Sequence, residues 1–223
     1  YGPHRDLHSF PTRRSSDLDD NLIKQFKKEH NLNTAPIILT VGNVTERKGQ
    51  EIVIRSLPII LRDFGDVNYL MVGLATEKRK LQEIAIILGV EKHIHFLGRL
   101  KESDLLLAYN VCDIFVMTSR HNQQGDFEGF GIAVIEAALC GKPAVVTDNS
   151  GLKEAVIDQK TGLVVKENDP LSTAQAIINL LKSDETRNKM GQAAQERATN
   201  SQTWEEGIFQ YHKALEEWLE SGR

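Results

Sequence analysis

The chain has 223 residues, of which 40% are hydrophobic, and this suffices for one α/β domain of upper ordinary size or for two small ones. The net charge of -4 and the pI near 6.0 argue against a nucleic-acid partner, and no apolar run approaches the ~18 residues that span a bilayer. Cys112 and Cys140 each lie in an apolar run, which favours buried thiols over a disulfide framework or a metal site. The composition therefore indicates a soluble globular protein.

Residues 1–18 have neither helical nor strand periodicity, and they lack the apolar core of a secretory signal. Arg13 and Arg14 are typical of a transit peptide, but Asp6 and Asp17 count against one. The stretch also resembles translated sequencing-adapter text. We therefore expect a non-native or disordered leader, followed by one folded domain over 19–223.

The folded part begins with a short amphipathic helix over 19–30 and a buried apolar strand over 36–42. A helix over 50–62 with a kink at Pro58 completes the first βα unit. The same alternation predicts further strands over 68–72, 93–97, 113–118, 143–147 and 162–165. The intervening helices are expected over 77–88 and 103–109, with one more that ends at 140 and a short one that ends at 156. Three closing helices are expected over 171–182, 185–198 and 203–220. This order predicts a doubly wound, Rossmann-like parallel sheet of about six strands with a carboxy-terminal helical tail, and its ligands would bind at the carboxyl ends of the strands.

Glu136 is the one polar side chain between Ile132 and Cys140. A helix of this composition is buried nearly all round, and a buried carboxylate costs several kcal/mol unless it is paired or hydrogen-bonded. A lysine or a backbone amide could satisfy it for purely structural reasons. A ligand hydroxyl is the other partner that the position allows.

The loop before this helix is rich in glycine and carries a second carboxylate. Gly129 and Gly131 let a ligand approach the backbone, and the helix start leaves the amides of Phe130, Gly131 and Ile132 without carbonyl partners. Such a terminus favours phosphate. With Glu128 on one side and Glu136 on the other, the loop offers anion contacts in the middle and hydroxyl acceptors at both ends, as a nucleotide-sugar requires.

At these residues the chain resembles glycosyltransferase family 4, whose members are retaining enzymes with two Rossmann-like domains, the GT-B fold. The resemblance is carried by the two glutamates in an E-x7-E frame and by the segments 41–49, 96–100 and 112–119. Their order and spacing match across roughly 36–220. The resemblance implies that 19–223 is the nucleotide-sugar-binding domain and that an amino-terminal acceptor domain belongs with it.

The family pattern also implies residue roles. Glu136 would bind the ribose hydroxyls and Glu128 the transferred sugar near the reacting carbon. Lys48 would neutralise the diphosphate, and the amides of Phe130, Gly131 and Ile132 would bind it. Arg99 and Leu100 would lie along the base, and Gly42 and Asn43, in the loop after the first strand, would complete the donor site. Asn43 stands where family members often have arginine, so either Arg47 or Arg120 compensates or the leaving diphosphate is held less tightly.

The resemblance further implies no metal and no cofactor beyond the donor itself. His93 and His95 alternate as on one exposed strand face, and with no carboxylate or cysteine near them in the sequence we expect no metal there. The acceptor could be a lipid, a polysaccharide or a small molecule. A cytoplasmic location is expected, and peripheral attachment to the inner membrane face is left open.

Three alternatives compete with this interpretation. A nucleotide-sugar epimerase or a phosphorylase could use the same fold, although a phosphorylase needs a cofactor lysine and a longer chain. A nicotinamide-dependent oxidoreductase is disfavoured because the loop over 42–49 lacks G-x-G-x-x-G. A nucleotide-binding module that does not catalyse transfer by itself is the most serious, because the acceptor site of such transferases lies in the amino-terminal domain.

Overall fold

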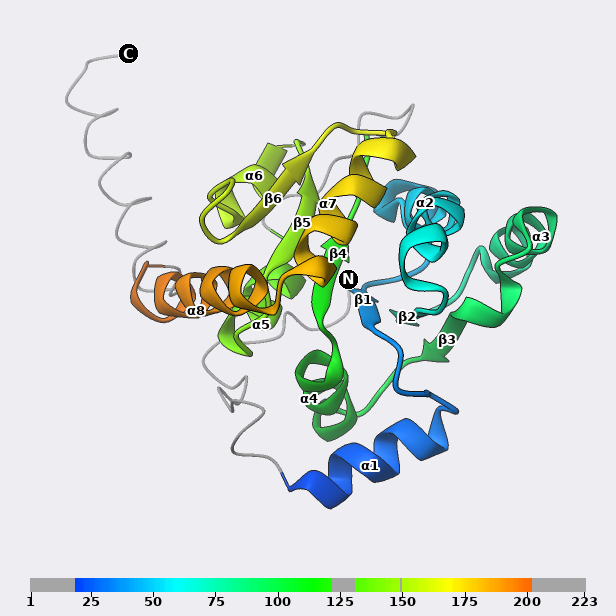
Figure 1. The fold of residues 1–223 in the computed structure, drawn as a ribbon, viewed down its shortest axis with the longest axis horizontal. Coiled ribbons are helices and arrows are strands. Elements are labelled where there is room, and N and C mark those ends of the chain that lie inside the picture. Colours follow the sequence, from blue (N-terminus) through cyan, green and yellow to red (C-terminus); the bar gives the residue numbers. More distant parts are fainter. Residues whose placement is uncertain (1–18, 122–130, 149, 202–223) are drawn as a thin grey trace, which may run out of the picture.

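The computed structural model describes residues 19–121, 131–148 and 150–201 (Figure 1). Its centre is a six-stranded sheet in which all paired strands are parallel and the order is β3-β2-β1-β4-β5-β6. The strands are β1 (Ile37–Val41), β2 (Asn68–Val72), β3 (Ile94–Gly98), β4 (Ile114–Met117), β5 (Ala144–Thr147) and β6 (Gly162–Val165). The doubly wound, Rossmann-like sheet predicted from the sequence is confirmed.

Helices cover both faces of this sheet, and two separate hydrophobic clusters fill the layers. The first layer holds α1 (Asp20–Glu29), α4 (Glu102–Val111), α5 (Ile132–Leu139), α6 (Ser150–Ala155) and most of the apolar contacts of α8 (Asp184–Ser201). The second layer holds α2 (Gln50–Phe64), α3 (Lys78–Leu88) and α7 (Pro170–Lys182). Because both faces are covered, the strands can be apolar throughout.

Side chains of β1 show how one strand serves both layers. Ile37 and Leu39 point into the first cluster, while Ile38 points into the second, and all three are at most 1% exposed. Successive strand residues face opposite sides, so an uninterrupted apolar run is needed where both sides are dry. Each such side chain contributes about 1.5–3 kcal/mol through burial.

The helix bounds follow local chemistry closely. The side chain of Asp169 accepts hydrogen bonds from the amides of Leu171 and Ser172, so it caps α7 at its start, and Pro170 occupies the first turn. The helix predicted over 50–62 continues through Pro58 to Phe64, and the one predicted over 185–198 continues to Ser201. The leader 1–18 and the predicted helix over 203–220 lie outside the described residues.

The strand order reverses between β1 and β4, which are neighbours in the sheet although two strands separate them in the chain. In doubly wound sheets the loops that follow such neighbours diverge and leave a crevice for ligands. The loops after β1 and β4 are therefore the place to look for a site. Among the described helices, none is both long and apolar enough to cross a membrane.

Candidate functional site

The loop after β1 brings Gly42 and Lys48 together. A Cβ atom placed on Gly42 would lie 3.3 Å from Cε and 3.6 Å from Nζ of Lys48, so the lysine side chain runs directly across the glycine. Lys48 ends the 3-10 turn η3 (Glu46–Lys48), and its side chain is half-buried rather than extended into solvent. A positive charge is thus held at the carboxyl end of β1, where the topology predicts a ligand.

Gly49 anchors this turn on β4. It adopts a left-handed conformation with φ 69°, and a Cβ atom there would lie 1.8 Å from the carbonyl oxygen of Thr118. The Thr118 hydroxyl donates a 2.7 Å hydrogen bond to the Gly49 carbonyl. No residue with a side chain fits at this contact, so glycine fixes the distance between the Lys48 turn and the end of β4.

Asn43 is exposed, and its oxygens are used within the protein. Its side-chain oxygen accepts a hydrogen bond from the amide of Leu74 (3.2 Å), and its carbonyl accepts one from Nε2 of Gln50 (3.2 Å). The side-chain NH₂ is therefore the group of Asn43 that can donate to a bound anion.

Arg99 and Leu100 lie at the same edge of the sheet, two strands away from Gly42. The Gly73 amide donates to the Gly98 carbonyl (2.8 Å), and a Cβ atom on Gly73 would lie 2.3 Å from the Gly42 carbonyl oxygen. The ends of β1, β2 and β3 are thus in direct backbone contact. Arg99 is exposed, whereas Leu100 is half-buried against the first hydrophobic cluster.

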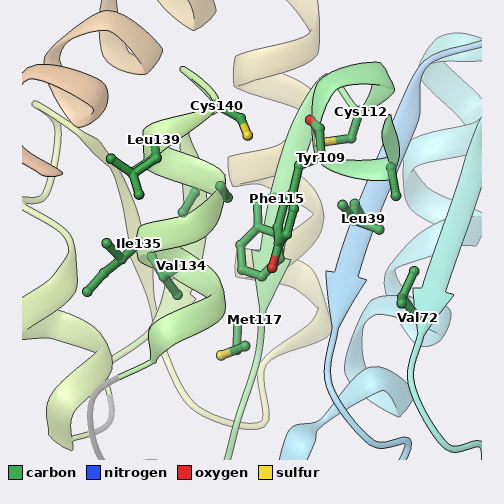
Figure 2. Close-up of a cluster of buried hydrophobic side chains, with 14 of the residues drawn as sticks. Leu39, Val72, Tyr109, Cys112, Phe115, Met117, Val134, Ile135, Leu139 and Cys140 are labelled. Atoms are coloured by element: carbon green, nitrogen blue, oxygen red, sulfur yellow. Dashed lines mark hydrogen bonds between the residues drawn. The ribbon is translucent and has the colours of Figure 1, made fainter. Parts of the chain in front are cut away.

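Glu136 lies in α5 and is 3% exposed, as predicted for a carboxylate on an apolar helix. One of its partners is a residue that was not considered from the sequence. The hydroxyl of Tyr109, which is fully buried on α4, donates a 2.6 Å hydrogen bond to Oε2 of Glu136. Figure 2 shows Tyr109 beside Phe115 of β4, and the two ring centroids are 5.9 Å apart. The packed tyrosine therefore orients the carboxylate.

The start of α5 is packed closely against a neighbouring helix. Gly131 is its N-cap residue, and a Cβ atom there would lie 2.7 Å from Cδ2 of Leu152, so α6 packs directly against the start of α5. Ile132 is the first residue of the helix, a position whose amide has no partner within the helix. Two other predicted site residues, Glu128 and Phe130, lie outside the described residues.

Of the two arginines considered as substitutes for a cation at position 43, Arg120 is bound within the protein. Its guanidinium contacts Glu46, Asn168 and Glu51. His121, the next residue, donates its amide to Glu167 (2.7 Å), and its Nδ1 lies 3.0 Å from the second carboxylate oxygen of Glu167. These contacts link the loops that follow β1, β4 and β6.

The expectation for His93 and His95 needs correction. They do not share an exposed strand face, because His93 lies before β3 in the 3-10 turn η4 (Glu91–His93) and is 4% exposed. Nor is His93 without a carboxylate, since its Nδ1 lies 2.9 Å from Asp66. His95 is half-buried on β3, where burial lowers the pKa of its imidazole. Within the described ranges, no group of three or more His, Cys, Asp or Glu could hold a metal ion.

Three residues at the site escaped sequence reasoning. Tyr109 contacts the predicted site residue Glu136, Thr118 contacts Gly49 next to Lys48, and Glu167 binds His121. Tyr109 lies in a helix that is buried along most of its length, so its hydroxyl required a polar partner that the sequence did not identify. Glu167 comes shortly after β6, and parallel strands bring their carboxyl ends to one edge of the sheet. Its position after a strand could therefore have predicted that it lies near the site.

Comparison with known proteins places this geometry in a family. Residues 23–197 match the family model described as "Glycosyl transferases group 1". A GDP-mannose-dependent alpha-(1-6)-phosphatidylinositol monomannoside mannosyltransferase of Mycolicibacterium smegmatis is 30% identical over 208 residues, covering 92% of this chain and 54% of the relative. A D-inositol 3-phosphate glycosyltransferase of Corynebacterium efficiens is 31% identical over 172 residues, covering 74% of this chain and 39% of the relative.

Solved structures share the fold. A glycosyltransferase from Rickettsia africae superposes with a TM-score of 0.77 at 22% identity, and Anabaena HepE in complex with UDP superposes with a TM-score of 0.73 at 21% identity. In both cases the match covers 92% of this chain and 54% of the other. The chain thus spans about half the length of the Mycolicibacterium relative and of these two structures. With its family model matched over most of its length, the chain belongs to the group 1 glycosyltransferases.

Proposed function

We propose that the chain binds a nucleoside diphosphate sugar and forms the donor half of a retaining, metal-independent glycosyltransferase. The observation that carries the proposal is the Lys48 side chain lying across Gly42 at the point where the strand order reverses. A half-buried ammonium there suits a diphosphate, because a cation beside exposed backbone at the carboxyl ends of parallel strands attracts phosphate.

In this proposal the residues divide the donor between them. Lys48 and the first amides of α5 neutralise the diphosphate, and Glu136 accepts hydrogen bonds from the ribose hydroxyls. When the bond from the sugar to the diphosphate breaks, the negative charge that develops on the leaving group is stabilised by groups already in position. The hydrogen bond from Tyr109 supports the ribose role, because it orients a carboxylate that has little freedom to move.

The proposal also covers the base of the donor nucleotide and the place where the acceptor binds. The relative from Mycolicibacterium smegmatis uses GDP-mannose by its name, so a guanine nucleotide is the first donor to test here. Because the chain spans only about half of that relative, we place the acceptor site in a partner domain. The described chain would then bind the donor without completing transfer.

Isothermal titration with GDP, UDP and ADP tests the proposal. We expect micromolar binding of at least one nucleotide, weakened at least about tenfold in Lys48→Ala, which is the loss of one charge-assisted hydrogen bond. Lys182→Ala is the matched control, since Lys182 pairs with Asp63 at the ends of α7 and α2, on the opposite edge of the sheet. Millimolar or weaker binding of all three nucleotides, unchanged in Lys48→Ala and Glu136→Ala, would refute the proposal.

A further inference from the structure

The segment Thr118–His121, which we name the 118–121 bridge, ties the Lys48 turn to the rest of the site. On the side of β1, the Thr118 hydroxyl donates to the Gly49 carbonyl, and the Arg120 amide donates to the Arg47 carbonyl at 2.8 Å. The Nε of Arg120 then donates to the Glu46 carbonyl at 2.9 Å. Glu46, Arg47 and Gly49 are thus all hydrogen-bonded to the bridge.

On its other side the bridge is held by β5 and by the loop after β6. The Thr147 hydroxyl donates to the Ser119 carbonyl at 2.5 Å. One Nη of Arg120 donates to the side chain of Asn168 at 3.2 Å, and Glu167 accepts from the His121 amide. The side chain of Arg120 therefore reaches both the turn after β1 and the loop after β6.

The charge of Arg120 is balanced within this network. Its Nη2 lies 3.2 Å from one carboxylate oxygen of Glu46 and 3.8 Å from one of Glu51, and its side chain is only 15% exposed. Burial favours a raised pKa for Glu51, but hydrogen bonding to Arg55 and the charge of Lys80 outweigh it and lower the pKa. Glu51 is thus ionised at neutral pH, and Arg120 is neutralised by carboxylates rather than offered to a ligand.

We propose that Arg120 is a positioning residue that holds the Glu46–Gly49 turn in the one arrangement that lays Lys48 across Gly42 for the donor diphosphate. The inference rests on the proposed function for its ligand. In this arrangement Arg120 does not replace the cation that is missing at Asn43 by contacting the diphosphate itself. It acts on the diphosphate through Lys48. The planar fork is what suits arginine to this place, since it donates in several fixed directions at once.

A double-mutant cycle on the whole chain tests this inference, with affinity for GDP or the tightest-binding of the three nucleoside diphosphates as the readout. Arg120→Gln is expected to weaken binding about tenfold in the wild-type background and less than about twofold in the Lys48→Met background. Arg120→Lys is expected to be nearly as weak as Arg120→Gln, because it retains the charge but loses the fork. Restoration of affinity by lysine, or an equal loss in both backgrounds, would overturn the inference.

Arg55→Gln is the matched control, because Arg55 also binds Glu51, at 2.9 Å, but lies on α2 and makes no contact with the turn in the described network. It should bind the nucleotide within about twofold of wild type. If Arg120→Gln does not fold, Asn168→Ala removes only one bond of the guanidinium and should reproduce the loss in weaker form.

Amide hydrogen exchange separates failure of this inference from failure of the proposed function. Without any nucleotide, exchange at Lys48 and Gly49 should accelerate at least about tenfold in Arg120→Gln and stay unchanged in Arg55→Gln. If the wild-type chain binds no nucleotide, the proposed function is wrong, and faster exchange would still support the positioning of the turn. Unchanged exchange in Arg120→Gln would refute it whatever the nucleotide does.

Discussion

Replacing Gly49 with alanine should destabilise the protein far more than the same change at Gly89. Both glycines are left-handed helix caps, with φ 69° and 67°, so both substitutions carry the same backbone penalty of about 1–2 kcal/mol. They differ in surroundings. The new methyl group at Gly89 meets nothing within 4 Å, whereas the one at Gly49 would lie 1.8 Å from a backbone oxygen of Thr118.

Relief of that overlap requires the Lys48 turn and the end of β4 to move apart, which breaks the hydrogen bond from Thr118 to Gly49. We therefore expect Gly49→Ala to cost at least ~4 kcal/mol in the free energy of unfolding, and Gly89→Ala about 1 kcal/mol. Thermal and urea denaturation of both variants, followed by circular dichroism, measures the difference. Costs within about 1 kcal/mol of each other would refute the close packing of the turn on β4.

Three further perturbations test other parts of the structure. Tyr109→Phe should cost about 1.5–3 kcal/mol of stability in urea unfolding, because it leaves the buried carboxylate of Glu136 without its hydroxyl donor, and much less in a Glu136→Leu background; equal costs would contradict this. Hydrogen bonding from the Ser172 amide lowers the pKa of Asp169 in the folded protein, so the ionised carboxylate stabilises the fold, and this stabilisation is lost as the pH falls through the folded-state pKa. Asp169→Asn should therefore make the melting temperature fall less steeply between about pH 5 and pH 2. Burial raises the pKa of the thiols of Cys112 and Cys140 to about 12, so a disulfide reagent at pH 8 should modify both in denaturant but neither in the native protein, and rapid native labelling would contradict their burial.

Much of the fold could be predicted because its strands are buried on both faces. Apolar runs such as 37–41 and 68–72 are each followed by glycine and alternate with segments of helical periodicity, and that alternation leads to a parallel sheet. The order of the strands in the sheet was not predicted, because no single run determines it. The helix ends are set by caps and tertiary packing, which explains why α2 continues two residues beyond its predicted end at Arg62.

Part of the site could be predicted where the environment of a single residue demands a polar partner. Glu136 is a lone carboxylate on an apolar helix, so burial and a partner were expected, but the partner's identity depends on how α4 packs beside α5. Likewise, the contacts of Arg120 join residues that are 48 and 74 positions apart in the chain. Contacts between residues so far apart in the chain depend on the assembled sheet, so local sequence patterns do not predict them. The burial of His93 beside Asp66 was missed for the same reason.

The most direct measurement is a crystal structure of this chain with its tightest-binding nucleoside diphosphate. We expect a phosphate oxygen within about 3 Å of the Lys48 ammonium, at the carboxyl ends of β1 and β4, with the ribose hydroxyls on Glu136. The protein has another hollow between β6 and α7, lined by Gln159, Lys166 and Asn179 among others. A nucleotide bound there, with Lys48 still lying across an unoccupied Gly42, would contradict the account.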